Sequence, residues 1–257
     1  MDEPKKSLGQ HWLNDESALE MIAEAAEIEK TDTVLEIGPG LGSLTRYLVG
    51  QARDVVAVEL DEKLARDLPN RLSAKNLAVH QADILKFDFN DLPAGYKVVA
   101  NIPYYLTSNL LRVLSESPNP PALMVLLVQK EVAERICAEP GQMSLLSVSV
   151  QLYYQTRLDL IVPAALFEPP PKVDSQVVVL ARHAKPLFKD LDKQSFFQVV
   201  KAGFSGRRKK LRGSLAAGLG IDKDQADKLL EKAGISGDLR AQNLSLQDWH
   251  RLSQQLS

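Results

Sequence analysis

The chain has 257 residues, of which 45% are hydrophobic, and its formal net charge is −2 at pH 7. This length is enough for one large domain or for a large and a small one. The longest purely apolar run, residues 122–128, is too short to span a bilayer, and the first residues are charged and polar with no apolar stretch behind them. The sequence therefore predicts a cytoplasmic protein without a membrane span or an export signal.

Cysteine and histidine side chains are few and scattered. Cys137 is the only cysteine, which excludes an internal disulfide framework and a cysteine-rich metal site. The four histidines, His11, His80, His183 and His250, show none of the spacings typical of metal ligands. We therefore expect no bound metal.

Short β-rich runs alternate with helical patterns through the first two-thirds of the chain, which is typical of an α/β fold. Seven strands are expected, at residues 34–37, 55–59, 78–80, 97–100, 123–128, 155–161 and 176–180. From about residue 186 the β pattern stops, and helices are expected at residues 195–203, 207–217, 223–233 and 246–256. The sequence thus predicts an α/β domain over residues 1–185 and a small all-α domain over residues 186–257.

Asn101, Ile102, Pro103 and Tyr104 form an NIPY tetrapeptide directly after the fourth expected strand. The lone pair of an exocyclic adenine amine is delocalised into the ring, so an enzyme that alkylates it must draw the nitrogen toward tetrahedral geometry. The Asn101 side-chain oxygen and the Ile102 carbonyl can each accept a hydrogen bond from one N–H of the amine. Pro103 would fix that carbonyl in a rigid turn, and Tyr104 offers a flat face for an extruded base. An Asn-x-Pro-Tyr sequence is also an ordinary turn, so the motif alone does not decide its role.

The segment EIGPGLG at residues 36–42 lies between the first expected strand and a helical pattern. Glycines such as Gly38 and Gly40 let the backbone adopt positive φ and approach a ligand closely. The second strand ends in Glu59, where a carboxylate can bind the hydroxyls of a ribose. This pattern suits a nicotinamide-dependent dehydrogenase as well as a methyltransferase.

Asp83 follows the third expected strand, where its side chain can accept a hydrogen bond from an adenine amine. The glycine loop, Glu59, Asp83 and the NIPY motif lie at the carboxyl ends of four successive strands. Ligands bind at this edge of an open parallel sheet. Together the four elements favour a nucleotide-like cofactor and a methyl transfer over a hydride transfer.

The charges of the chain are unevenly distributed. Residues 15–36 hold eight acidic residues and one basic one, whereas residues 201–212 hold six Lys and Arg residues and no acidic one. A basic run is often only a solvated surface, but it can also bind nucleic-acid phosphates through the release of counterions. The candidate RNA-binding residues lie in one expected helical stretch after Phe204, and they are Arg207, Arg208, Lys209, Lys210 and Arg212.

These motifs and their order resemble the small-subunit ribosomal RNA adenine dimethyltransferases (the KsgA/RsmA family) over nearly the whole chain. Trp12 stands where the family more usually has Phe, and Tyr105 stands where Asn or another polar residue is expected. The segments that carry the resemblance are KSLGQHWL at 6–13, EIGPGLG at 36–42, Glu59, QAD at 81–83, NIPY at 101–104, QKEV at 129–132, FEPPPKVDS at 167–175 and FSGRRKKLR at 204–212.

The resemblance implies a Rossmann-like class I methyltransferase domain with a mostly parallel seven-stranded sheet, followed by a small all-α domain that docks on RNA or the ribosome. It implies dimethylation of the N6 amine of two adjacent adenosines in a hairpin loop near the 3′ end of 16S (small-subunit) ribosomal RNA, in a partly assembled 30S particle. The chain is expected to act as a monomer. The methyl donor is expected to be S-adenosylmethionine (SAM), bound at His11, Leu13, Gly38, Gly40, Glu59, Asp83 and Asn101.

The chemistry of the residues agrees with that assignment. A sulfonium methyl is already a strong electrophile, so positioning can carry the catalysis without a metal or a covalent nucleophile. Asn101 and Ile102 would stabilise the charge that develops on nitrogen, and the methylated amine can release its proton to water. Phe167, at the start of a proline-rich run, is expected to be a second stacking wall for the base, or else a core aromatic residue.

Three other functions remain open. A large-subunit ribosomal RNA adenine methyltransferase of the antibiotic-resistance type would share the NIPY motif and the donor site, although the FEPPPKVDS segment favours the small-subunit family. DNA adenine methyltransferases usually carry Pro at the second motif position, where this chain has Ile102. A non-catalytic ribosome-assembly or transcription factor would not need the Glu59, Asp83 and NIPY residues that this chain retains.

Overall fold

The computed structural model describes residues 4–5, 8–206 and 208–256. The chain divides into two compact units, of which the first comprises Met1–Glu134 and Tyr154–Arg182 and the second comprises Arg135–Tyr153 and His183–Ser257. The sequence-based division at residue 185 differs, because it leaves residues 135–153 with the α/β domain. In the structure this segment groups with the C-terminal helices, since its Met143, Val148 and Leu152 belong to their hydrophobic core.

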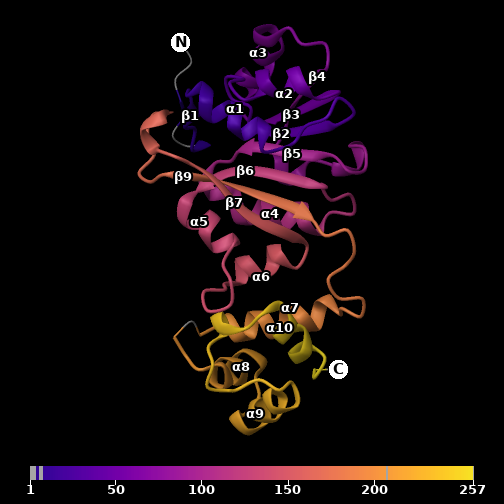
Figure 1. The fold of residues 1–257 in the computed structure, drawn as a ribbon, viewed down its shortest axis with the longest axis vertical. Helices are drawn as coiled ribbons and strands as arrows, with labels where there is room; N and C mark the ends of the chain where they lie inside the picture. Colours follow the sequence, from indigo (N-terminus) through magenta and orange to yellow (C-terminus); the bar gives the residue numbers. More distant parts are fainter. Residues whose placement is uncertain (1–3, 6–7, 207, 257) are drawn as a thin grey trace. The chain divides into compact units, whose positions relative to one another are not determined.

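The first unit is built on a seven-stranded sheet with the order β4-β3-β2-β5-β6-β9-β7 (Figure 1). Strands β2 to β6 are mutually parallel, and β9 pairs antiparallel with β6 and β7. The predicted mostly parallel seven-stranded sheet is confirmed. The strands are β2 (Thr33–Ile37), β3 (Asp54–Glu59), β4 (Leu77–Gln81), β5 (Lys97–Asn101), β6 (Leu123–Gln129), β7 (Tyr154–Val162) and β9 (Ser175–Arg182).

Helices and short 3₁₀ turns connect these strands. Every residue of β2 is buried, as expected for a parallel strand that is covered on both faces. Asp15 and Asp61 fix the starts of the first and third helices by accepting hydrogen bonds from main-chain N–H groups. The connecting elements are α1 (Glu16–Glu24), α2 (Thr45–Gln51), α3 (Glu62–Leu72), η2 (Ile84–Lys86), η3 (Phe89–Asp91), η4 (Tyr104–Leu106), α4 (Thr107–Glu116), α5 (Lys130–Ile136) and η5 (Ala164–Leu166).

The strand order reverses between β2 and β5. From β2 the chain adds β3 and β4 on one side, and it then returns to add β5 and β6 on the other. The helices that follow β2 and β5 therefore diverge, which leaves a crevice at the carboxyl ends of these strands. This reversal places the glycine loop after β2 opposite the NIPY motif after β5.

A second, two-stranded sheet is absent from the sequence-based expectation. Strand β1 (Trp12–Leu13) pairs antiparallel with β8 (Phe167–Glu168), so that Leu13 lies opposite Phe167. Two-residue strands carry no alternating pattern that a sequence could reveal. The pairing joins the N-terminal motif to the FEPPPKVDS segment, although the two are more than 150 residues apart.

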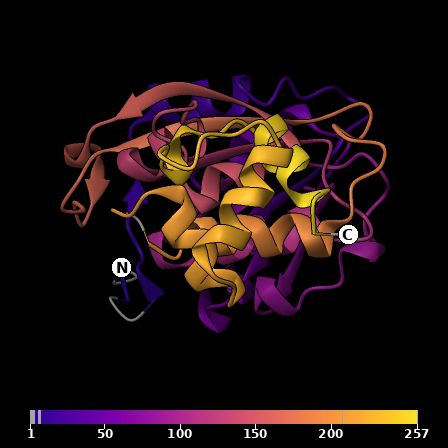
Figure 2. The ribbon, with the colours of Figure 1, turned by 90° about the horizontal axis from the view of Figure 1, so that it is seen from below.

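The second unit is helical, with its four C-terminal helices drawn in orange to yellow in Figure 2. Phe196 and Trp249 are fully buried in its core. Reciprocal capping boxes, Asp222 with Gln225 and Ser245 with Asp248, begin the third and fourth of these helices. The elements are α6 (Leu145–Gln151), α7 (Lys193–Phe204), α8 (Leu211–Leu219), α9 (Lys223–Lys232), η6 (Ala241–Asn243) and α10 (Leu246–Ser253).

The helix expected at residues 207–217 begins later than predicted. Arg208 and Lys209 lie in the loop that precedes α8, and Lys210 occupies the cap position with an extended backbone. Arg207 lies outside the described residues. Arg208, Lys209 and Lys210 are therefore not helical, whereas Arg212 belongs to α8. The first residue of α8 was hard to predict because the cap residue, Lys210, makes no side-chain capping hydrogen bond and therefore gives no capping signal in the sequence.

Helix α8 contains two glycines with contrasting surroundings. A Cβ at Gly218 would lie 2.4 Å from the Cα of Ala202 in α7, whereas one at Gly213 would meet nothing within 4 Å. We expect Gly218→Ala to lower the free energy of unfolding by about 2–3 kcal/mol, because contact with a backbone atom forces the helices apart. Gly213→Ala should instead raise it by up to about 1 kcal/mol through helix propensity.

Urea unfolding followed by circular dichroism measures both free energies. Since both substitutions add one methyl group to the same helix, Gly213→Ala controls for the change in helix propensity. Similar effects of the two substitutions would contradict the close approach of α7 and α8 at Gly218.

Candidate active site

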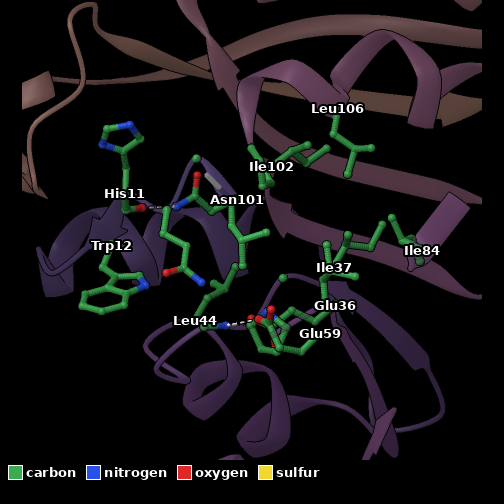
Figure 3. A pocket seen from close by; sticks show the side chains of 18 of the residues that line it. His11, Trp12, Glu36, Ile37, Leu44, Glu59, Ile84, Asn101, Ile102 and Leu106 are labelled. Atoms are coloured by element: carbon green, nitrogen blue, oxygen red, sulfur yellow. Dashed lines mark hydrogen bonds between the residues drawn. The ribbon is translucent and has the colours of Figure 1, made fainter. Parts of the chain in front are cut away.

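A cavity of about 280 Å³ lies in the first unit at the carboxyl ends of the parallel strands (Figure 3). The glycine loop, the ends of β3 and β5, and the N-terminal segment around β1 form its walls. Every residue that the sequence placed in the catalytic and donor sites lines this cavity. These residues are His11, Leu13, Gly38, Gly40, Glu59, Asp83, Asn101, Ile102, Pro103, Tyr104 and Phe167.

The glycine loop departs from ordinary backbone geometry at two positions that face the cavity. Gly38 has φ = 67° and Gly40 has φ = 58°, values that L side chains rarely adopt. The N–H of Gly38 donates to the Val58 carbonyl at 2.9 Å, which ties the loop to β3. A Cβ at Gly40 would lie 3.3 Å from Nε1 of Trp12. Glycine is thus required for conformation at both positions, and at Gly40 also for space.

Glu59 ends β3 and is only 5% exposed. Its Oε2 accepts from the N–H of Gly40 at 3.0 Å, and its Oε1 accepts from the N–H of Asp61 at 2.9 Å. Burial raises the pKa of Glu59, and these two N–H groups oppose the rise. The carboxylate is therefore held in one orientation beside the glycine loop. Lys5 pairs with Asp61 at 2.7 Å, and this hydrogen bond lowers the pKa of Asp61.

Glu36 is a buried carboxyl group to which the sequence analysis assigned no role. It is 2% exposed, lines the cavity from β2, and its Oε2 has no hydrogen-bond partner among the described residues. Burial raises its pKa to about 8, with a further contribution from Glu59, while Thr45 opposes the rise. Glu36 is thus mostly protonated at neutral pH. The available signal was an acidic residue within the otherwise apolar strand TVLEI.

Asp83 caps η2 through Oδ1, which accepts from the N–H of Leu85 at 3.0 Å. Apolar side chains flank this carboxylate and Glu59 on the cavity wall. Leu60 directly follows Glu59 and is 45% exposed, and Ile84 directly follows Asp83. Sequence reasoning missed both, although each adjoins a predicted carboxylate. They offer an apolar surface for a flat heterocycle between two hydrogen-bond acceptors.

Asn101 is fixed by the N-terminal segment. Its Nδ2 donates to the carbonyl of His11 at 3.2 Å, as the dashed line in Figure 3 shows. This bond sets the plane of the amide and leaves Oδ1 as the acceptor on its other side. The next residue, Ile102, is 1% exposed, and its N–H donates to the Leu127 carbonyl at 3.2 Å. Pro103 follows with φ = −53°, so the main chain at the end of β5 is held on both sides of the Ile102 carbonyl.

Tyr104 is half-buried and held at both ends. Its hydroxyl lies 2.8 Å from the Ser175 hydroxyl, and its ring stacks on His11 with centroids 6.1 Å apart and an interplanar angle of 21°. His11 in turn lies with Nδ1 2.7 Å from the Pro169 carbonyl. Burial raises the pKa of Tyr104, so its hydroxyl remains neutral at physiological pH. Tyr104 is therefore a rigid aromatic surface rather than a titrating group.

Phe167 serves two surfaces. It is 5% exposed and belongs to the hydrophobic core of the first unit, with Leu13 and Leu19. It also lines the cavity. The sequence left open whether Phe167 is a core aromatic residue or a stacking wall. The structure places Phe167 in the core, and stacking of a base on it stays a prediction.

The basic residues of the second unit differ in their partners. Lys210 pairs with Asp238 at 3.0 Å, and Arg212 pairs with Asp238 at 2.7 Å and with Asp227 at 3.4 Å. Arg208 and Lys209 are exposed, and neither forms an ion pair with any described residue. Two of the candidate RNA-binding residues are therefore partly neutralised within their own unit.

The described residues contain no group of three or more His, Cys, Asp or Glu side chains arranged to hold a metal ion. None of their helices combines the length and the apolar character that a bilayer span requires.

The whole chain, residues 1–257, matches the family model for ribosomal RNA adenine dimethylase. It is 43% identical over 252 residues to the ribosomal RNA small subunit methyltransferase A of Dehalococcoides mccartyi, covering 96% of this chain and 87% of that protein. It is 41% identical over 267 residues to the protein of the same name from Streptococcus thermophilus, covering 98% of this chain and 91% of that one.

Solved structures give the same assignment. A dimethyladenosine transferase from Plasmodium falciparum superposes with a TM-score of 0.82 and 28% identity, covering 94% of this chain and 96% of that one. The 23S rRNA methyltransferase ErmE superposes with a TM-score of 0.77 and 31% identity, covering 95% of this chain and 99% of that one. The chain therefore belongs to the ribosomal RNA adenine dimethylase family.

Proposed function

We propose that this chain uses SAM to dimethylate the N6 amine of two adjacent adenosines in a hairpin loop near the 3′ end of small-subunit ribosomal RNA. The observation that carries the proposal is the position of Asn101, which is oriented by the His11 carbonyl in the same cavity as Glu59 and Asp83. Two relatives at 41–43% identity bear the name ribosomal RNA small subunit methyltransferase A, which favours this substrate over large-subunit RNA. The partner is then a partly assembled 30S particle in the cytoplasm, with the chain acting as a monomer.

The cavity residues fit the parts of SAM. The carboxylate of Glu59 is oriented to accept from ribose hydroxyls, and that of Asp83 can accept from the adenine amine between Leu60 and Ile84. Main-chain groups at Gly38, Gly40, His11 and Leu13 line the rest of the cavity and would lie close to the amino-acid part of the donor. Two buried polar atoms, Nε1 of Trp12 and Oε2 of Glu36, have no hydrogen-bond partner among the described residues, and a polar ligand would supply one.

SAM supplies an electrophilic sulfonium methyl group when it is bound. The protein's task is to present the adenine amine with its lone pair toward that methyl group. Oδ1 of Asn101 and the carbonyl of Ile102 would each accept a hydrogen bond from one N–H of the amine. These bonds would stabilise the positive charge that develops on nitrogen. Both acceptors are held by hydrogen bonds of the chain itself, so little reorganisation is required. The proton of the methylated amine leaves to water.

Tyr104 and Phe167 would hold the extruded base. Tyr104 is anchored by Ser175 and His11, which makes its ring a fixed stacking surface. Phe167 enters the same cavity from β8 and would form the opposite wall.

The role of Glu59 predicts a specific loss of donor binding. Glu59→Ala removes charged hydrogen bonds to ribose hydroxyls, each worth roughly 1.5–3 kcal/mol, so we expect SAM affinity to fall tenfold or more. Isothermal titration calorimetry measures this affinity directly. Glu62→Ala, at an exposed residue of α3, is the control and should bind SAM like the parent. Equal affinities for Glu59→Ala and the parent would contradict the assigned role.

The exposed cations Arg208 and Lys209 predict a separate RNA-docking surface, to which Arg207, Lys210 and Arg212 would add. Arg208→Glu with Lys209→Glu should weaken binding to the small subunit and leave SAM affinity and thermal stability unchanged. Each lost phosphate contact should reduce the slope of log affinity against log salt by roughly 0.7–0.9. Filter binding at several salt concentrations measures both quantities.

The matched control reverses two exposed charges elsewhere in the same unit, Lys223→Glu with Lys228→Glu on α9. It makes the same change in net charge. If the loop variant and the control behaved alike, the loop would be only a solvated surface and docking would depend on another one.

The proposed function is tested by offering labelled SAM with unmethylated small subunits, naked small-subunit RNA and large-subunit RNA, and by mapping the methylated base. Dimethylation of two adjacent adenosines in the small-subunit RNA is the expected result. Methylation of large-subunit RNA alone would favour the antibiotic-resistance type. SAM binding without methylation of any of the three would favour an assembly factor.

A further inference from the structure

Tyr105 directly follows the NIPY motif and differs sharply from Tyr104. It lines the cavity, yet its side chain is 66% exposed. Both tyrosines belong to η4, in which successive side chains point about 120° apart because a 3₁₀ turn has three residues. Tyr105 therefore does not share the anchored position of Tyr104. It is a large aromatic side chain left exposed at the rim of the site.

One side of the Tyr105 ring is supported by bare backbone. A Cβ at Gly9 would lie 3.4 Å from Cε1 and 3.5 Å from Cδ1 of Tyr105, and 3.7 Å from Cβ of Pro103. Gly9 has φ = 62°, so the chain turns there in a conformation that favours glycine. The absence of a side chain lets this turn approach the ring, while the exposed part of the ring faces solvent.

The substrate needs a flat surface at this point. An adenosine that leaves its stack to enter the cavity removes the stacking partner of the neighbouring base. Proteins hold such unpaired bases on Phe, Tyr or Trp rings, irrespective of the identity of the base. An aromatic ring at the rim, four residues after the end of β5, is placed to receive the neighbour of a base that occupies the cavity.

We propose that Tyr105 is the stacking platform for the nucleobase next to the flipped adenosine. This inference rests on the proposed function, because it takes the occupant of the cavity to be an adenosine of an RNA loop. One neighbour of each target adenosine is the other target, and we place that base on Tyr105. Tyr105 thus acts as a positioning residue that keeps the second adenosine beside the cavity while the first one reacts.

Three substitutions at Tyr105 separate stacking from apolar contact. Tyr105→Ala removes the ring, Tyr105→Leu keeps an apolar side chain without a flat face, and Tyr105→Phe keeps the ring without the hydroxyl. Ile161→Ala, at a 45% exposed residue of β7, is the control for loss of an exposed apolar side chain. SAM affinity and thermal stability should equal those of the parent in all four variants.

We expect single-turnover methylation of unmethylated small subunits, at subsaturating enzyme, to fall roughly tenfold in the Ala and Leu variants. The Phe variant and the Ile161→Ala control should stay within about twofold of the parent, since a stacking contribution requires only the ring. A Leu variant as active as the parent would overturn the inference.

A spectroscopic measurement reports the stacking itself. In two hairpin RNAs, one or the other of the adjacent adenosines is replaced by 2-aminopurine, whose fluorescence is quenched when it stacks. At saturating protein, the complex with Tyr105→Ala should be brighter than the complexes with the parent and with Tyr105→Phe in at least one hairpin. Equal fluorescence for the parent and Tyr105→Ala in both hairpins would also overturn the inference.

The design distinguishes this inference from the proposed function. A parent protein that methylates small subunits, together with a Tyr105→Leu variant of equal rate, would reject the stacking platform and leave the proposed function intact. A parent protein that binds SAM but does not methylate small subunits would reject both.

Discussion

Asn101→Ala is expected to lower the single-turnover rate of methylation by about 100-fold or more, comparable to the loss of one preorganised donor in an oxyanion hole. The substitution removes Oδ1, an acceptor that gains strength as positive charge develops on the adenine nitrogen. The Ile102 carbonyl is main chain and stays in place, so some activity should persist. Because the loss falls on the transition state, SAM affinity should change much less than the rate.

Rapid-quench measurement with saturating SAM and enzyme in excess over small subunits separates this chemical step from binding and product release. Asn109→Ala, at an exposed residue of α4, is the matched control and should react at the parental rate. A rate for Asn101→Ala within threefold of the parent would exclude the proposed amine clamp. Thermal unfolding checks that loss of the hydrogen bond to the His11 carbonyl leaves the fold intact.

The sheet and the gathering of the candidate residues around one cavity were predictable because local signals and one global rule coincide. Each central strand is an apolar run bounded by polar or turn residues, and parallel strands end at a common edge. Four candidate residues lie at or just after the carboxyl ends of four such strands, so their convergence on one cavity could be predicted without any interatomic distance. They are Gly38, Glu59, Asp83 and Asn101. The first unit therefore follows closely from its sequence.

The parts that escaped prediction depend on partners remote in the sequence. The pairing of β1 with β8 involves two residues on each side, and only the folded chain brings them together. Residues 135–153 lie between two strands of the first unit in the sequence, and their assignment to the second unit follows from Met143 and Leu152 in its core. The orientation of Asn101 likewise depends on His11, ninety residues earlier.

The signal in the sequence for the burial of Glu36 was ambiguous, since an acidic residue before a glycine loop is as readily a ligand-binding group as a buried one. The structure gives it a pKa of about 8, well above its ordinary value of 4.5. The folded protein then holds a proton that the unfolded chain releases between these two pH values. The contribution of Glu36 to stability is therefore greatest below pH 4.5, decreases as pH rises through this interval, and reaches its lowest value above pH 8.

Glu36→Gln removes this titration while keeping nearly the same shape. We expect the stability of the variant relative to the parent to rise by about 1.4 kcal/mol for each pH unit between the two pKa values, and thus by several kcal/mol between pH 5 and pH 8. Glu59, whose pKa burial also raises, is present in both proteins, so its titration largely cancels in the comparison. Urea unfolding at constant ionic strength measures the difference, with Glu20→Gln on the exposed face of α1 as the control. If the free energies of unfolding of the parent and Glu36→Gln changed in parallel with pH, Glu36 would be ionised in the folded protein. The glycine loop would then have to accommodate a buried charge before SAM binds.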